Sequence, residues 1–194
     1  ALLREHKRAG QSFYLHNRVE TIDEAAEKLA QLCPELRFLV GHGQLPEREL
    51  EERMLAFIRG DADVLVATTI IESGIDMPMV HTLVVERADL LGLGQLHQIR
   101  GRVGRSGQRA YAYLFYPPNR ELTEEAYERL KTIGESTELG SGFRIAMRDL
   151  EIRGAGNLLG SEQSGFVAAV GFDMYCRLLD EAVMAADLFL TSGT

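Results

Sequence analysis

The strongest constraint on the fold is the alternation of short apolar segments with longer amphipathic segments over the first 117 residues. Thr21 and Glu24 have the spacing of a capping box and predict the start of a helix, which Pro34 ends. A second helix begins at Pro46 and ends at Gly60. The apolar segments predict strands at residues 11–16, 36–40, 64–67, 82–85 and 110–116. Strands that alternate with helices connect as βαβ units around a parallel sheet, so the sequence predicts an α/β fold.

After Pro117 the alternation ends and helical spacing takes over. Residues 123–135 and 143–150 each carry apolar side chains on one helical face, and the turn Gly140-Ser141-Gly142 separates them. Two helices joined by a short glycine turn form a helical hairpin. Four glycines in residues 154–165 predict a loop, and residues 172–188 predict a last helix. We therefore expect three parts: an α/β lobe at 1–117, a helical hairpin and loop at 118–166, and a C-terminal helix and tail at 167–194.

Composition excludes several classes of protein. No run approaches the roughly 18 apolar residues that a membrane-spanning helix needs. Cys33 and Cys176 stand alone, which argues against a disulfide framework or a zinc site and favours the cytoplasm. The net charge of −8 argues, taken alone, against a dedicated nucleic-acid-binding domain. The chain does not begin with Met, so we expect it to be a piece of a longer protein.

A phosphate cradle of the P-loop type is missing from the sequence. That cradle needs a Gly-Lys pair, whose lysine holds the β- and γ-phosphates, and the chain has no Gly-Lys dipeptide. No acidic pair follows an apolar strand to hold magnesium, and we predict no metal site. The chain alone is therefore expected to hydrolyse no ATP.

An arginine-rich segment, Gln95–Arg105, contains the pattern Gln-x-x-Gly-Arg-x-Gly-Arg. Arg102 and Arg105 are three residues apart, a spacing that puts two guanidinium groups on one helical turn facing a triphosphate. Gln98 adds a hydrogen-bonding group, and Gly101 and Gly104 allow close approach of the backbone. The alternative interpretation is a solvated, basic end of a helix.

A second polar segment, Ala67–Pro78, follows the predicted strand at 64–67. Ligands of α/β sheets bind at the carboxyl ends of strands, and Thr68 and Thr69 offer hydroxyl and amide groups there for a phosphate. Asp76 is suited to accept a hydrogen bond from a ribose hydroxyl. The alternative interpretation is a polar turn between a strand and a helix, with Asp76 as a cap.

Together these segments resemble the second motor lobe of superfamily two helicases and translocases. Ala67–Pro78 resembles helicase motif V, Gln95–Arg105 resembles motif VI, and His16-Asn17-Arg18 resembles motif IV. Gly41-His42-Gly43-Gln44 resembles the motif between IV and V. The resemblance covers about residues 8–117 and implies a RecA-like lobe, related to the P-loop NTPases.

The resemblance also implies roles for individual residues. Arg102, Arg105 and Gln98 would act on the γ-phosphate of an ATP that a preceding lobe holds together with its magnesium. The nucleotide side would include Gly74, Asp76, Gly101 and Gly104. The backbone phosphates of DNA would meet His16, Asn17, Gly43, Thr68 and Thr69. Contacts of this kind position a duplex without reading its sequence.

The segment Asp149–Gly165 resembles the translocation motif shared by RecG helicases and bacterial transcription-repair coupling factors. Arg153 and Gln163 are the residues to which this motif assigns the coupling of ATP state to movement on DNA. The stretches Arg153–Asn157 and Gly171–Tyr175 favour the coupling-factor family. Asn157 stands where Glu is common in both groups, so it receives no role.

The resemblance therefore implies the second motor lobe of an ATP-dependent double-stranded DNA translocase. Such a translocase displaces stalled RNA polymerase and couples transcription to nucleotide excision repair. Its partners would be double-stranded DNA, the first RecA-like lobe of the same protein and, through other regions, RNA polymerase and excision-repair proteins, with no membrane. Two alternatives remain: the lobe of a RecG-type fork-regressing helicase, and a non-catalytic helicase-like scaffold, against which intact Gln98, Arg102 and Arg105 argue.

Overall fold

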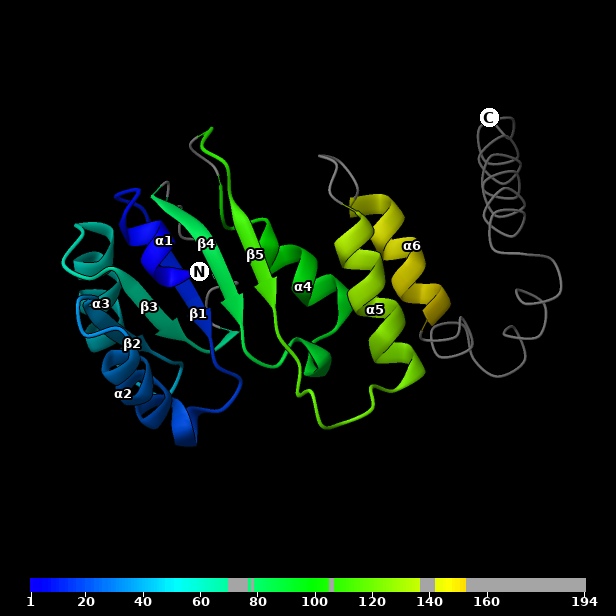
Figure 1. Ribbon diagram of the computed structural model, residues 1–194, viewed down its shortest axis with the longest axis horizontal. Coiled ribbons are helices and arrows are strands. Elements are labelled where there is room, and N and C mark those ends of the chain that lie inside the picture. Colours follow the sequence, from blue (N-terminus) through cyan, green and yellow to red (C-terminus); the bar gives the residue numbers. More distant parts are fainter. Residues whose placement is uncertain (70–76, 78, 105–106, 137–141, 153–194) are drawn as a thin grey trace, which may run out of the picture. The chain divides into compact units, whose positions relative to one another are not determined.

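The computed structural model describes residues 1–69, 77, 79–104, 107–136 and 142–152. The chain forms two compact units, Ala1–Ile145 and Ala146–Thr194, and the first contains the sheet (Figure 1). Helix α6 (Gly142–Ile152) begins in the first unit and supplies the described residues of the second. The predicted glycine turn (apart from Gly142), the loop at 154–165 and the last helix at 172–188 lie outside the described residues.

Five parallel strands form one sheet in the order β2-β3-β1-β4-β5. Their bounds are β1 Gln11–Leu15, β2 Phe38–Gly41, β3 Val64–Ala67, β4 Val80–Val85 and β5 Tyr111–Leu114. All five strands predicted from the sequence are present. Leu15 at the end of the central strand lies opposite Ala67 and Val85, so the strands end together at one edge. This arrangement confirms the predicted α/β class.

The helices fall where the sequence predicts them, with one addition. The predicted ones are α2 Ile22–Leu32, α3 Glu47–Ile58 and α5 Glu124–Glu135, and α4 Leu93–Arg100 carries the first part of the arginine-rich segment. Short 3-10 helices occupy Val19–Thr21 (η1) and Ala88–Leu90 (η3). The addition is α1, Leu2–His6, whose five residues are too few to give a periodic apolar pattern. No helix among the described residues is long and apolar enough to cross a bilayer.

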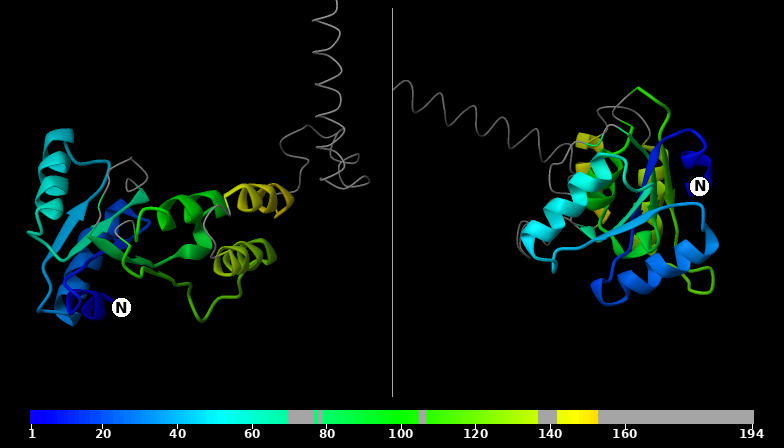
Figure 2. Two further views of the ribbon diagram at one scale, coloured as in Figure 1. Left: turned by 90° about the horizontal axis from the view of Figure 1, so that it is seen from above. Right: turned by 90° about the vertical axis from the view of Figure 1, so that its left-hand side faces the viewer.

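The core has two layers because successive strand residues point to opposite faces of the sheet. On one face, Val64, Val66 and Val84 pack in a cluster with Ile22 of α2 and Leu2 of α1. On the other face, the ring of Phe13 lies 5.8 Å from that of Phe57 in α3, centroid to centroid. Figure 2 shows α2 and α3 on opposite sides of the sheet. Helices therefore cover both faces of the sheet, and the ends of its strands are left for the connecting segments.

The predicted capping box at the start of α2 is not formed. Thr21 is the residue before the helix, but its side chain makes no capping hydrogen bond. The Thr21 hydroxyl instead lies 2.8 Å from Nε2 of His16. The short helix η1 leads directly into α2, and Thr21 has a near-helical ψ of 9°. The prediction was wrong because the hydroxyl already has a tertiary partner that sequence spacing does not reveal.

Candidate nucleotide and nucleic-acid sites

The carboxyl edge of the sheet gathers the residues predicted to contact DNA. His16 and Asn17 follow β1, Gly43 follows β2, and Thr68 and Thr69 follow β3. Backbone hydrogen bonds hold these strand ends together: the His16 amide donates to the Ala67 carbonyl at 2.9 Å, and the Thr68 amide to the Gly41 carbonyl at 3.4 Å. Gly43 is exposed, Thr69 is partly exposed and Thr68 is buried. Segments far apart in sequence thus form one surface.

Both ring nitrogens of His16 are engaged within this edge. Nδ1 pairs with the Glu86 carboxylate, and Nε2 pairs with the hydroxyl of Thr21. In this conformation the ring has no nitrogen left for a phosphate. The same Glu86 carboxylate also acts on the neighbouring Tyr14: burial, and to a smaller extent this carboxylate, raise the pKa of the Tyr14 hydroxyl to about 12. His16 therefore joins the ends of β1, β4 and η1 within the described structure.

Asn17 lies on the same edge, beside the end of β4. Its side-chain amide donates to the Arg87 carbonyl at 3.0 Å. Its side-chain oxygen is buried and has no hydrogen-bond partner among the described residues. Buried polar atoms usually find a partner, so this oxygen is an open acceptor beside the predicted DNA surface. Nδ2 retains its second hydrogen for an acceptor outside the lobe.

Helix α4 carries the arginine-rich segment from one edge of the sheet to the other. It begins at the carboxyl edge, where the Gly92 amide donates to the Gln95 side chain at 3.1 Å. Leu93, Leu96 and Ile99 are buried and fix the helix to the lobe. Gln98 is exposed on the opposite face, and Arg102, just after the helix, is partly exposed. Of the three predicted catalytic side chains, Gln98 is therefore accessible on the helix and Arg102 is accessible in part.

Gly104 determines where the segment after α4 lies. Its amide donates to the carbonyl of Val80, the first residue of β4, at 3.0 Å. Its φ is +82°, and a Cβ at this position would lie 2.5 Å from Cβ of Ala110. Both observations require glycine. Gly101 differs, because it has an ordinary helical conformation at the end of α4.

The two predicted sets of residues therefore lie at opposite edges of the sheet. The DNA set follows the carboxyl ends of β1, β2 and β3, whereas Gly104 and Arg102 lie at the amino end of β4. The connection from β3 to β4 joins the two edges because both strands run in the same direction. Among the predicted residues, Gly74, Asp76, Arg105, Arg153 and Gln163 lie outside the described residues.

Sequence reasoning gave no role to Arg100, which connects α4 to α5. Its Nη1 donates to the carbonyls of Ile133 and Ser136 at 2.9 and 2.6 Å, at the carboxyl end of α5. Its Nη2 lies 3.3 Å from Nδ1 of His97. Burial, followed by the charge of Arg100, lowers the pKa of His97, so the ring is neutral at pH 7. A cation near the end of a helix satisfies carbonyls that have no partner within the helix.

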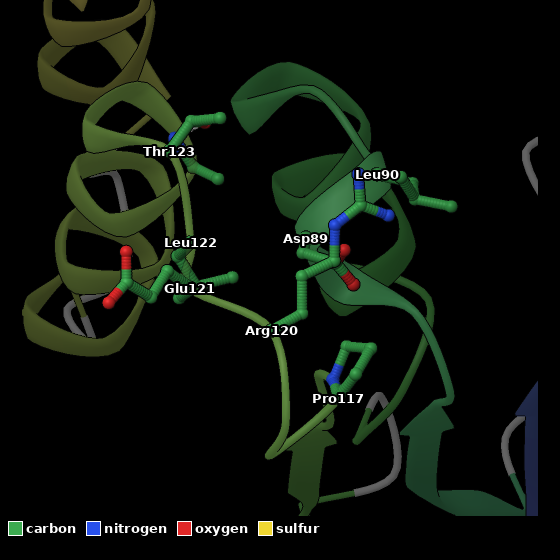
Figure 3. Close-up of a pocket in the computed structure, with 8 residues that line it drawn as sticks. Asp89, Leu90, Pro117, Arg120, Glu121, Leu122 and Thr123 are labelled. Atoms are coloured by element: carbon green, nitrogen blue, oxygen red, sulfur yellow. Dashed lines mark hydrogen bonds between the residues drawn. The ribbon is translucent and has the colours of Figure 1, made fainter.

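A small pocket of about 200 Å³ lies between η3 and the segment that leads into α5 (Figure 3). Asp89 pairs with Arg87 at 2.7 Å, and the side chain of Arg120 extends beside Asp89. The lining residues are Asp89, Leu90, Pro117, Arg120, Glu121, Leu122, Thr123 and Ala126. None of them belongs to the predicted sets. Among the described residues no group of three His, Cys, Asp or Glu side chains is arranged to hold a metal ion.

Comparison with known proteins finds relatives of similar sequence over most of this chain. The transcription-repair-coupling factor of Staphylococcus haemolyticus (strain JCSC1435) is 59% identical over 94% of this chain and 16% of that protein. The transcription-repair-coupling factor of Mycobacterium tuberculosis (strain CDC 1551 / Oshkosh) is 58% identical over 94% of this chain and 15% of that protein. The chain therefore spans about 16% of the length of these curated relatives.

The fold has a close structural counterpart as well. The solved structure of RecG bound to a three-way DNA junction has a TM-score of 0.67 and 40% sequence identity, over 84% of this chain and 21% of that chain. The predicted RecA-like lobe is thereby confirmed. The family model described as "Helicase conserved C-terminal domain" matches residues 1–107, more than half of the chain. The chain belongs to the helicase conserved C-terminal domain family.

Proposed function

We propose that this chain is the second motor lobe of an ATP-driven, double-stranded DNA translocase of the transcription-repair coupling type. The observation that carries the proposal is that Gln98 is exposed on α4 and that Arg102 is partly exposed just after it, close to where Gly104 binds the amino end of β4. The similarity of 58–59% to transcription-repair-coupling factors points to the same family. A non-catalytic, helicase-like scaffold would not need these side chains or Gly104, so their presence argues against that alternative.

The amino end of β4, where Gly104 binds Val80, is the side of the lobe that would face a nucleotide. The sequence has no phosphate cradle, so ATP and its magnesium would be held by another lobe. Arg102, with Arg105 and Gln98, would complete that pocket when the lobes close, and Gly74, Asp76, Gly101 and Gly104 would line its near wall. An arginine finger stabilises charge on the transferred phosphoryl group and contributes about 10³–10⁵ in rate.

The carboxyl ends of β1, β2 and β3 form the side of the lobe that would face DNA. Gly43 and Thr69 would offer backbone amides, and Thr68 and Thr69 would offer hydroxyls, to the phosphates of a duplex. Asn17 has a second amide hydrogen for the same purpose. His16 would first support this surface through Glu86 and Thr21, and contact phosphate only if its ring exchanged one of those partners. Closing and opening of the lobes would then move these contacts along the duplex.

The remaining parts extend the proposal to the whole protein. Arg100 and His97 join α4 to the end of α5, which gives a route from the arginine segment into the hairpin. Arg153 and Gln163 would couple ATP state to movement. Displacement of stalled RNA polymerase and recruitment of excision repair would use other regions. Because bacterial DNA lies in the cytoplasm, we expect the protein to act there.

A RecG-type helicase is the second candidate. The RecG structure shares this fold at 40% identity, whereas the coupling factors reach 58–59% over a larger share of the chain. The higher identity favours the coupling-factor assignment. Displacement of a stalled RNA polymerase by the full-length protein distinguishes the two, because a fork-regressing helicase has no dedicated contact with polymerase.

The experiment is an Arg102→Ala substitution in the full-length protein, with DNA-stimulated ATP hydrolysis as the readout. We expect kcat to fall by about 10³-fold or more while DNA affinity is retained. Arg59→Ala is the matched control, since Arg59 is exposed and pairs with Asp61 two residues away. The 194-residue chain alone should give no turnover. Unchanged hydrolysis by the Arg102→Ala protein would refute the proposed role.

A further inference from the structure

The segment between α4 and β5 carries Arg102, and its described residues, 101–104 and 107–110, are called the arginine loop below. Its exit is held from the far end of the chain. Nη2 of Arg8, in the turn after α1, donates to the Arg109 carbonyl at 2.8 Å. The two residues are 101 positions apart in sequence. The loop is thus attached to the N-terminal helix as well as to its own neighbours.

Tyr111 adds a second contact at the same place. The guanidinium carbon of Arg8 lies 5.4 Å from the centroid of its ring, and that of Arg109 lies 5.6 Å from it. Both distances are within the range of cation–π attraction. Because an arginine has a planar fork, it can stack on a ring and donate to a carbonyl at once, which a lysine cannot do. Arg8 therefore fixes the loop exit in direction as well as in distance.

Glu5 attaches α1, the helix that precedes Arg8, to the sheet. Its side chain is 1% exposed and accepts a hydrogen bond from the Thr82 hydroxyl at 2.6 Å. The other carboxylate oxygen has no hydrogen-bond partner among the described residues; it lies 3.5 Å from Nδ1 of His81 and 3.8 Å from Nη2 of Arg8. The hydrogen bond from Thr82 and the nearby charge of Arg8 offset part of the cost of burying this carboxylate. These contacts fix α1 to β4.

The same strand holds the middle of the loop. Val80, the first residue of β4, accepts from the Gly104 amide, and Thr82 lies two residues further along. The loop is therefore attached to β4 at two points: directly through Gly104, and indirectly through Arg8 and Glu5. Arg8 and Arg109 are both positively charged and both lie over the ring of Tyr111, so the Glu5 carboxylate beside Arg8 offsets part of their repulsion.

We propose that Arg8 is a positioning residue for Arg102, and that Glu5 supports it by fixing α1 to β4. The inference rests on the proposed function of Arg102. Removing Arg8 would free the exit of the loop and leave its middle attached at Gly104. Arg102 would remain present but less well oriented, and misplacement of a catalytic group by about 1 Å can cost roughly 10²-fold in rate.

The test uses the full-length protein with Arg8→Ala and Arg8→Lys, and with Arg59→Ala as the control. We expect Arg8→Ala to lower kcat for DNA-stimulated ATP hydrolysis by about 5- to 50-fold. KM for ATP and the affinity for DNA should stay within about twofold, since Arg8 is given no ligand contact. Arg8→Lys should recover part of the loss, because its ammonium still donates to the Arg109 carbonyl. A thermal unfolding midpoint equal to that of Arg59→Ala separates positioning from general destabilisation.

A double variant asks whether Arg8 acts through the fingers. Adding Arg8→Ala to Arg102→Ala should cause no further loss, because the group being positioned is already gone. Normal kcat for Arg8→Ala, or losses that multiply in the double variant, would overturn the inference while leaving the proposed function intact. Normal hydrolysis by the Arg102→Ala protein would instead refute the proposed role of Arg102, and the inference about Arg8 with it.

Discussion

Replacing Gly104 with alanine tests the geometry of the arginine loop most directly. An alanine in the left-handed region costs roughly 1–2 kcal/mol. Its methyl group would also lie 2.5 Å from Cβ of Ala110, and forcing an extra methyl into occupied space costs about 1–3 kcal/mol. The stiffer unfolded chain returns about 0.4–1 kcal/mol. We therefore expect Gly104→Ala to lower the free energy of unfolding by about 1–5 kcal/mol.

Gly107 provides a matched control within the same loop. Its φ is +76°, close to that of Gly104, but a Cβ there would have no neighbour within 4 Å. Gly107→Ala should therefore lose only about 0–1.5 kcal/mol. The difference between the variants isolates the contact with Ala110. A compensating Ala110→Gly substitution should remove that difference, because it removes the atom with which the new methyl collides.

Urea unfolding followed by circular dichroism measures these free energies in the 194-residue chain. In the full-length protein, Gly104→Ala should also lower kcat by more than about tenfold, since the loop must shift to admit the methyl. Gly107→Ala should hydrolyse ATP almost normally. Equal losses of stability in the two variants, with no rescue by Ala110→Gly, would refute the argument from packing.

Two further predictions concern the hydrogen bonds and ion pairs around this lobe. Arg100→Ala should lower the free energy of unfolding by about 2–4 kcal/mol, because two carbonyls at the end of α5 lose a charged donor; urea unfolding measures the loss, and Arg100→Lys should recover part of it. The hydrogen bond from Arg87 holds the pKa of Asp89 below its usual value, although burial acts in the opposite direction. The ionised Asp89 therefore stabilises the fold above about pH 4, and this stabilisation is lost as the pH falls through the lowered pKa. Asp89→Asn should therefore flatten the dependence of unfolding free energy on pH between about 5 and 3, and an unchanged slope would contradict this assignment.

The strands were predictable because their apolar side chains are contiguous. β3 has the predicted bounds of Val64–Ala67, whereas β4 begins two residues before the predicted Thr82. The difference arises from His81, a polar residue that is fully buried because Glu5 lies against it. A pattern based on hydropathy cannot identify such a residue as part of a buried strand.

Motif spacing selected Gln98 and Arg102 as candidate site residues, and their roles stay predictions. The spacing did not show that α4 runs back across the sheet, so that Arg102 lies at the edge opposite Thr68. The contact from Arg8 to Arg109 was also inaccessible, because a hydrogen bond across 101 residues leaves no local pattern.

Strand β4 has consequences for how such a lobe transmits force. Its six residues span about 20 Å, with Gly104 attached at its first residue and Asn17 attached just beyond its last. The strand is fully buried and lies between two parallel neighbours, which hold it within the sheet. Under the proposed function, a rotation of the lobe that brings Arg102 toward a nucleotide would therefore also move the opposite end of β4, beside Asn17.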